Sequence, residues 1–154
     1  MDLSSFLRPD AVRVQGQSAS KKRLFQELGE IAQSVYGLNI TDTVDALQER
    51  ESLGATGVGH GVALPHARLY GLDRVVGVFL RLEKPMDFDA VDRMPVDLIF
   101  ALFAPHGTGV EHLKALALVS RTFREEAMRD KLRSNSDPAA LHAVLTENHS
   151  TQAA

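Results

Sequence analysis

The chain offers imidazole groups for chemistry but no thiol. Its 154 residues include six His and no Cys. The lack of cysteine excludes disulfides, thiolate zinc sites, iron–sulfur clusters and cysteine nucleophiles. A neutral imidazole nitrogen is a competent nucleophile near pH 7. Histidine is therefore the residue type whose surroundings must be followed along the chain.

His66 lies in the segment Leu-Pro-His-Ala-Arg at positions 64–68. Pro65 lacks a backbone N–H and has a fixed φ, so we expect the chain to leave its strand there. Ala67 leaves space around the ring and Arg68 adds positive charge. An exposed imidazole in such surroundings is suited to attack, or to carry, an anionic group. From these residues alone, a surface histidine without function is the simpler interpretation, because single motifs give false positives.

The segment from Gly54 to Arg68 is rich in glycine but lacks the known nucleotide-binding patterns. A P-loop needs Gly-Lys followed by Ser or Thr, and that sequence does not occur. The dinucleotide fingerprint Gly-x-Gly-x-x-Gly fails because Val62 or Leu64 stands where the third glycine is needed. We therefore expect no nucleotide cofactor, and glycines that serve tight turns and close strand packing.

The other histidines suggest simpler roles. His112 lies in the first turn of a predicted helix, where bonding to nearby backbone is the plain alternative to a functional role. His60 precedes His66 by six residues. Zinc needs three or four ligands, and the spacing indicates no partner carboxylate, so no metal is expected. The remaining histidines are read as surface residues: His106, His142 and His149.

Composition predicts one ordinary domain spanning residues 1–154, with a frayed polar tail at 146–154. The net charge of −3 is weak evidence against a nucleic-acid partner, since phosphate binders usually carry a basic excess. No stretch reaches the apolar length of a membrane span, and the first ten residues lack the order of a signal peptide. We expect a cytoplasmic protein without membrane insertion.

Periodicity predicts helices before and after a strand-rich middle. One helix opens at Ser20 and stops at Gly37, and a second is capped by Thr41 or Thr43 and ends at Gly54. After the middle, helices are predicted at 111–123, at 125–133 and from Asp137-Pro138 onward.

The middle of the chain is predicted to form a sheet. Val75–Leu82 and Val96–Phe103 are nearly continuous apolar runs, typical of central strands buried on both faces. Two short strands are expected to join at Gly59–Gly61, with further short strands at Ala11–Val14 and Met86–Phe88. The fold class is therefore α/β (α+β), a mixed central sheet covered by helices.

The segment from Arg50 to Arg68 resembles the active-site signature of phosphotransferase-system (PTS) enzyme IIA domains of the fructose/mannitol type (EIIA type-2). That pattern is an Arg, then Ser/Ala-Thr-Gly-Ile-Gly-x-Gly-Ile-Ala-Ile-Pro-His and a small residue. The run 75–105 is similar to the family's core strands, and Glu111-His112-Leu113 to its second-histidine helix. The start, Leu3–Pro9, resembles the nitrogen-related branch, enzyme IIA-Ntr.

The resemblance implies the family's mannitol-like fold and a phosphotransferase activity without a cofactor. His66 would accept a phosphoryl group through Nε2, from a small phosphocarrier protein of the HPr or NPr type that is itself phosphorylated on histidine. Arg50 and His112 would line the site, and Thr56 and Gly57 would shape its wall.

Further expectations follow from the same resemblance. His60 stands where relatives often have Asn, so a third imidazole is expected near the phosphoryl group. Arg68 contributes to docking or only to surface charge. In the nitrogen branch, the phosphorylation state regulates partners such as sensor kinases and potassium-transport components. Two alternatives remain: a sugar-specific EIIA that passes the phosphoryl group to an EIIB, and a non-catalytic binding module.

Overall fold

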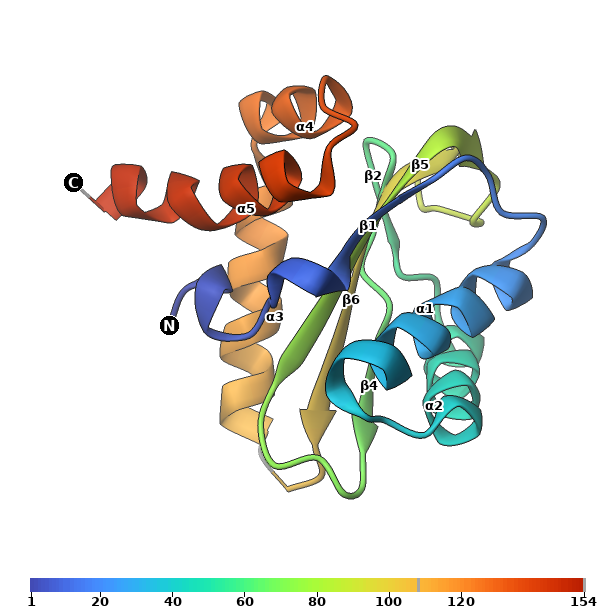
Figure 1. Cartoon of the computed structure of the whole chain (residues 1–154). Helices are drawn as coiled ribbons and strands as arrows, with labels where there is room; N and C mark the ends of the chain where they lie inside the picture. Colours follow the sequence, from blue (N-terminus) through green and yellow to red (C-terminus); the bar gives the residue numbers. More distant parts are fainter. Residues whose placement is uncertain (108, 154) are drawn as a thin grey trace.

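The computed structural model describes residues 1–107 and 109–153, with side chains up to position 147 in the last helix. The predicted frayed tail at 146–154 and the His149 side chain therefore fall largely outside the described part. Within that part, helices cover both sides of a six-stranded sheet (Figure 1). The strands are β1 (Val12–Gln15), β2 (Gly57–Gly59), β3 (Val62–Ala63), β4 (His66–Leu69), β5 (Val76–Met86) and β6 (Val96–Pro105). The helices are the 3-10 turns η1 (Leu3–Ser5) and η2 (Pro9–Ala11), then α1 (Lys21–Tyr36), α2 (Ile40–Leu53), α3 (Gly109–Arg124), α4 (Glu126–Arg133) and α5 (Pro138–Ala153).

The sheet is mixed, which confirms the predicted fold class. β1 runs parallel to β5, and β5 runs antiparallel to β6. β3 and β4 follow one another along the same edge of β6, both parallel to it, and β2 pairs antiparallel with β3. The central strands β5 and β6 are built from almost continuous buried residues. They are buried on both faces because α1 and α2 lie on one side of the sheet and α3 on the other (Figure 1).

The chain leaves its strand before Pro65 as expected, since β3 ends at Ala63, but a new strand that was not predicted begins at His66 and runs to Leu69. Pro65 lies between β3 and β4, and its carbonyl accepts a hydrogen bond from Leu102 N–H at 2.9 Å. Pro65 therefore lacks a backbone N–H to donate to β6, but its carbonyl still accepts a hydrogen bond from that strand. His66 then pairs in register with Leu102.

The central strands also extend further than predicted. β5 continues to Met86 as one strand, so the separate strand expected at 86–88 does not form. The register between β5 and β6 shifts between Arg81 and Met86. Such an irregularity bends a strand without ending it, which sequence periodicity does not indicate.

Capping residues fix the limits of the two helices on one side of the sheet. The Ser20 side chain accepts from Arg23 N–H at the start of α1, and Gly37 ends it in the left-handed conformation at φ +74°. The predicted caps Thr41 and Thr43 of α2 were wrong. Asn39 Oδ1 accepts from the backbone N–H of residue 42 at 3.0 Å, so the helix begins at Ile40.

A two-residue turn joins β2 and β3, as predicted. His60 and Gly61 form it with φ values of +58° and +77°. Two consecutive positive φ values are the signature of the turn that best matches the twist of a hairpin. Histidine is among the few non-glycine residues enriched in this region of φ, so the turn itself accounts for His60.

The last helix, α5, packs beside the N-terminal segment and β1, and α4 packs against α3 and α5 (Figure 1). Asp137 Oδ1 accepts from Ala139 N–H at 3.1 Å, in agreement with the predicted start of α5. None of the helices in the described part of the chain has both the length and the apolar character needed to cross a bilayer.

Candidate functional site

His66 begins β4 and meets the last turn of α2. Its Nδ1 lies 2.9 Å from the Leu64 carbonyl oxygen, and its Nε2 lies 3.2 Å from Nε of Arg50. A carbonyl only accepts and a guanidinium only donates. The neutral ring therefore carries its proton on Nδ1, and Nε2 holds a lone pair. The ring is half-buried rather than exposed as expected, because α2 covers one side of it.

Arg50 is held by two contacts. Besides its bond to His66, its Nη1 donates to the Gly54 carbonyl at 2.9 Å, at the C-terminal end of α2. The guanidinium thus satisfies an open carbonyl at the helix end and turns its Nε–H toward the imidazole. The positively charged guanidinium of Arg50 therefore lies beside Nε2 of His66, the nitrogen with the lone pair.

His112 approaches His66 from the opposite helix layer. The ring centroids lie 5.5 Å apart in an edge-to-face arrangement at 66°. The His112 side chain comes from the first turn of α3 and is buried, with 6% of its surface exposed. Its Nδ1 accepts a hydrogen bond from Arg68 Nε at 3.2 Å. Within the described residues, the buried Nε2 of His112 has no hydrogen-bond partner.

The structure thus assigns a contact to Arg68, which the sequence left between docking and surface charge. His66 and Arg68 project from the same face of β4, while Ala67 and Leu69 are buried on the other. The spacing of two residues on a strand was the available signal for this arrangement. Together, two histidines and two arginines from α2, β4 and α3 form what we call the histidine pair site: Arg50, His66, Arg68 and His112.

Burial and positive charge keep both rings of the histidine pair site neutral at pH 7. Burial lowers the pKa of His66 below its usual range and Arg50 adds to this, against the opposing effects of the Leu64 carbonyl and Glu51. The pKa of His112 is lowered to about 4, first by burial and then by the repulsion that its protonated form would meet from a protonated His66 ring and from Arg68. A neutral ring keeps one nucleophilic lone pair, which protonation would remove.

Thr56, which was expected to shape the wall of the site, makes its side-chain contact with Glu51, the residue after Arg50 in α2. The backbone N–H of Thr56 donates to Glu51 Oε2 at 3.1 Å, and its hydroxyl bonds the same carboxylate. Glu51 also pairs with Lys21 Nζ at 3.1 Å. Glu51, which no sequence pattern had singled out, therefore ties Thr56, the residue before β2, to the helix that carries Arg50.

Gly57 is needed for a close approach of two backbones. A Cβ at this position would lie 2.8 Å from both Cα and Cβ of Ala90. The Gly57 carbonyl accepts from Val91 N–H at 3.1 Å, which fixes the loop after β5 on β2. Its part in the molecule is thus the packing of this loop.

His60 lies away from the histidine pair site. Its backbone N–H donates to Asp92 Oδ2 at 3.0 Å, and its carbonyl accepts from Arg133. Along β6, His66 lies opposite Leu102 while β3 begins opposite Leu98, and four strand residues span roughly 13 Å. The structure therefore does not bring a third imidazole beside His66.

The other described histidines make contacts of their own. His106 stacks on exposed Tyr70 with ring centroids 3.7 Å apart, and His142 Nε2 lies 3.0 Å from the Leu7 carbonyl. No group of three or more His, Asp or Glu side chains among the described side chains, residues 1–107 and 109–147, is placed to hold a metal ion.

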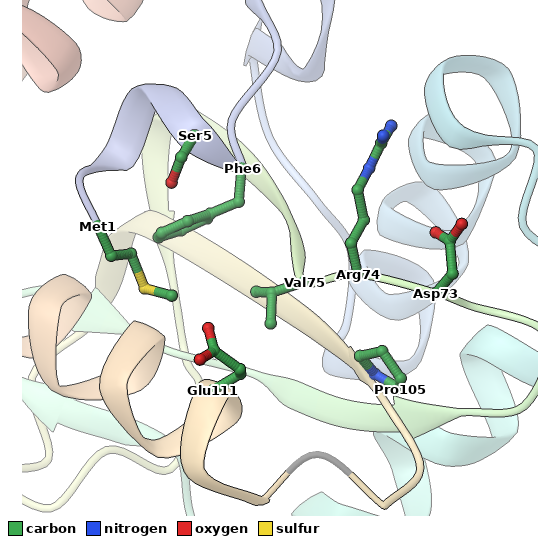
Figure 2. Close-up of a pocket in the computed structure, with 8 residues that line it drawn as sticks. All are labelled: Met1, Ser5, Phe6, Asp73, Arg74, Val75, Pro105 and Glu111. Atoms are coloured by element: carbon green, nitrogen blue, oxygen red, sulfur yellow. The ribbon is translucent and has the colours of Figure 1, made fainter.

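A separate cavity of about 290 Å³ lies between the N-terminal segment, the start of β5 and α3. Figure 2 shows Phe6 and Val75 in it, with Glu111 on the α3 side. His112 follows Glu111 in the chain but does not line this cavity. The cavity therefore lies next to the histidine pair site without forming part of it.

The comparisons with known proteins agree on the family of this chain. The family model described as "Phosphoenolpyruvate-dependent sugar phosphotransferase system, EIIA 2" matches residues 5–148. A "Nitrogen regulatory protein" of Bradyrhizobium diazoefficiens is 41% identical over 94% of this chain and 95% of its own length. A protein of the same name from Escherichia coli is 36% identical over 98% of this chain and 93% of its own length.

A solved structure shows the same fold at similar identity. The nitrogen regulatory protein IIA-Ntr from Neisseria meningitidis superposes with a TM-score of 0.84 at 37% identity, covering 92% of this chain and 97% of that one. The mannitol IIA of Escherichia coli, at 20% identity and a TM-score of 0.71, shares the fold. From the match over nearly its whole length, the chain belongs to the EIIA type-2 family of the phosphoenolpyruvate-dependent sugar phosphotransferase system.

Proposed function

We propose that this protein is a phosphoryl carrier of the nitrogen-regulatory type, with Nε2 of His66 as its acceptor atom. The supporting observation is the hydrogen-bond geometry of the histidine pair site, from which the proton positions follow. Nε2 of His66 holds a lone pair beside Arg50, and the buried Nε2–H of His112 lacks an acceptor among the described residues. The first group attacks phosphorus, and the others provide charge and a hydrogen bond for the phosphoryl oxygens.

The proposed step exchanges one nitrogen–phosphorus bond for another. The His66 lone pair attacks the phosphorus of a phosphohistidine on a carrier of the HPr or NPr type. The bond between phosphorus and the carrier imidazole breaks, and its electron pair stays on that carrier nitrogen. Charge builds on the three phosphoryl oxygens during this in-line transfer, so positioning and positive charge contribute more than acid–base chemistry.

Arg50 must change partners in this step. In the free protein its Nε–H faces the lone pair that attacks phosphorus. A guanidinium has a planar fork of donors that matches phosphate oxygens, so Arg50 gains a better acceptor once the phosphoryl group arrives. Its second contact, to the Gly54 carbonyl, keeps the side chain in place during this exchange.

The regulatory part of the proposal is supported by the names of the similar proteins. Relatives from several bacteria are called nitrogen regulatory proteins. We propose that the phosphorylation state of His66 controls binding to partners such as sensor kinases or potassium-transport components, and that this takes place in the cytoplasm.

A sugar-specific role is the second candidate, supported by one relative. A protein of Haloferax volcanii called "PTS system fructose-specific EIIA component" is 31% identical over 95% of this chain. In that case phosphorylated His66 would transfer its phosphoryl group onward to an EIIB domain. Mixing the phosphorylated protein with candidate EIIB domains and following loss of label from His66 separates the two roles.

Phosphorylation by a reconstituted relay tests the proposal. The protein is incubated with phosphoenolpyruvate, enzyme I and an HPr-type carrier, and its intact mass is measured. We expect one added phosphoryl group that is labile in acid and that disappears in His66→Ala. His106→Ala serves as the matched control, because that ring is exposed and stacks on Tyr70, and it should be labelled like the wild type. Stable labelling of His66→Ala would overturn the assignment.

A further inference from the structure

The contact between Arg68 and His112 decides which nitrogen of His112 carries the proton. Arg68 Nε lies 3.2 Å from His112 Nδ1. A guanidinium has no acceptor atom, so this bond exists only when Nδ1 holds the lone pair. The single proton of the neutral ring is then on Nε2, the nitrogen that has no partner within the described residues.

We propose that Arg68 is a positioning residue for phosphoryl transfer, which holds His112 in the tautomer whose Nε2–H is free to bind the phosphoryl group on His66. This inference rests on the proposed function of His66. It assigns to Arg68 a role in the reaction through His112, without direct contact with the reacting atoms.

The alternative tautomer would not serve this role. With the proton on Nδ1, His112 would direct an N–H at the Arg68 guanidinium and a lone pair toward the phosphoryl oxygens. Both contacts would then be repulsive. Burial of the ring, at 6% exposure, limits the water that is available to bridge either one.

The strand explains why Arg68 is able to hold this contact. His66 and Arg68 share one face of β4, and buried Ala67 and Leu69 fix the strand on its other face. The same short strand therefore carries both His66, the acceptor, and Arg68, which orients His112. A displacement of β4 would move both together, so their relation to His112 is set by the packing of α3.

Nitrogen-15 NMR of the unphosphorylated full chain tests the tautomer directly. Long-range correlation spectra at pH 7 distinguish a protonated ring nitrogen from one with a lone pair. We expect the Nε2–H form for His112 in the wild type. In Arg68→Met, which keeps the aliphatic stem and removes the donor, we expect a mixture of both tautomers. Arg68→Lys restores a donor and should recover the Nε2–H form in part.

Single-turnover transfer from the phosphorylated HPr-type carrier to His66 provides the second readout. We expect a roughly tenfold slower rate for Arg68→Met, less than the roughly hundredfold loss typical of removing a transition-state donor outright. Arg68→Lys should recover most of this rate. Arg121→Ala is the control, since this exposed arginine lies on the same helix as His112, about 13 Å further along its axis.

Each result decides the proposal. An Nδ1–H form of His112 in the wild type overturns it, as does an Arg68→Met protein with wild-type spectra and wild-type transfer. A slower rate with an unchanged tautomer would instead assign Arg68 to direct charge stabilisation and reject its action through His112. If the wild type takes up no phosphoryl group, the proposed function fails, while the NMR comparison still shows whether Arg68 sets the tautomer.

Discussion

The two histidines of the histidine pair site have opposite tautomers, and phosphoryl transfer requires this difference: one ring must offer a lone pair and the other an N–H. His66 has its proton on Nδ1 because the Leu64 carbonyl accepts it, so its Nε2 is a nucleophile. His112 has its proton on Nε2 because Arg68 donates to Nδ1. An unpaired buried N–H costs about 1–3 kcal/mol. A phosphoryl oxygen that accepts this bond recovers that free energy in the loaded state.

Replacement of Arg50 tests its contribution to the charge of the transition state. We expect Arg50→Ala to slow transfer from the phosphorylated carrier by about a hundredfold, the usual effect of removing one preorganised donor. The fold should remain intact, with about 1 kcal/mol lost from the bond to the Gly54 carbonyl. Single-turnover rates and thermal unfolding measure the two effects. An unchanged rate would remove Arg50 from the phosphate-binding group.

The lowered pKa of His112 predicts a loss of stability in mild acid. The ring has a pKa of about 4 when folded and 6.5 as the reference value, so the unfolded chain binds the proton more tightly. The stability contributed by the neutral buried ring is complete above pH 6.5 and is lost as the pH falls toward 4. The loss is about 3 kcal/mol.

Urea unfolding at pH 7 and at pH 4.5 measures this loss, with His112→Gln as the comparison. We expect the difference in unfolding free energy between the two pH values to shrink in His112→Gln and to stay unchanged in His106→Gln, whose side chain is exposed. Equal pH dependence in all three proteins would show that His112 is not the titrating group.

For single residues, the sequence predicted which side chains form the site better than it predicted their protonation. The motif around His66, read through its family resemblance, selected the three residues that the structure brings together: Arg50, His66 and His112. Their tautomers and lowered pKa values depend on burial by α2 and α3, which no local pattern contains. His60 was expected near the site because it stands where relatives often have Asn, but a hairpin turn and a strand separate it from His66.

At the scale of elements, the site depends on how α2 and β2 are tied together. Glu51 on α2 binds both the backbone and the hydroxyl of Thr56 and pairs with Lys21 at the start of α1. Its side chain is only 7% exposed, so this pair is screened less than a surface ion pair. Thr56 and Lys21, through Glu51, therefore support the helix that carries Arg50.

Gly57→Ala tests the packing of β2 against the loop after β5. The added methyl would lie 2.8 Å from two atoms of Ala90, and one of them is backbone, so the loop must shift. We expect a loss of about 1–3 kcal/mol in unfolding free energy. Gly16→Ala is the matched control, because nothing lies within 4 Å of a Cβ there, and it should change stability by less than about 0.5 kcal/mol. Equal stability of the two variants would contradict this account.

Elements with strong local signals were predicted well, and those decided by long-range contacts were not. Ser20 and Gly37 bound α1 as expected, because caps and left-handed glycines act within a few residues. β4 was missed because its edge is defined by pairing with β6, on residues more than thirty positions away in the chain. Proline at position 65 indicated an end, whereas the register with Leu102 continues past it.

At the scale of the whole molecule, the histidine pair site lies at β4, where side chains from α2 and from α3 meet. α2 supplies Arg50 from one side and α3 supplies His112 from the other, with β4 between them. Three large apolar side chains close to these residues in the chain are exposed: Leu53 by 80%, Val110 by 65% and Leu113 by 64%. With a net charge of −3, long-range steering of a partner contributes little, so contact with these side chains is expected to hold the carrier.

Leu113→Asp tests this account of docking. A carboxylate beside His112 would be desolvated against the apolar surface of a bound carrier, so we expect KM for the phosphorylated carrier to rise about tenfold, equivalent to about 1.4 kcal/mol of binding free energy. The maximal rate should stay close to that of the wild type, since Leu113 is exposed and the histidine pair site is intact. Met94→Asp is the control. Met94 is 58% exposed and lies just before the first residue of β6. Leu102, which pairs with His66, lies near the other end of this strand, roughly 20 Å away. Equal KM values for the two variants would place the carrier elsewhere on the molecule, whereas a rise in Leu113→Asp alone would locate docking on the α3 side of the site.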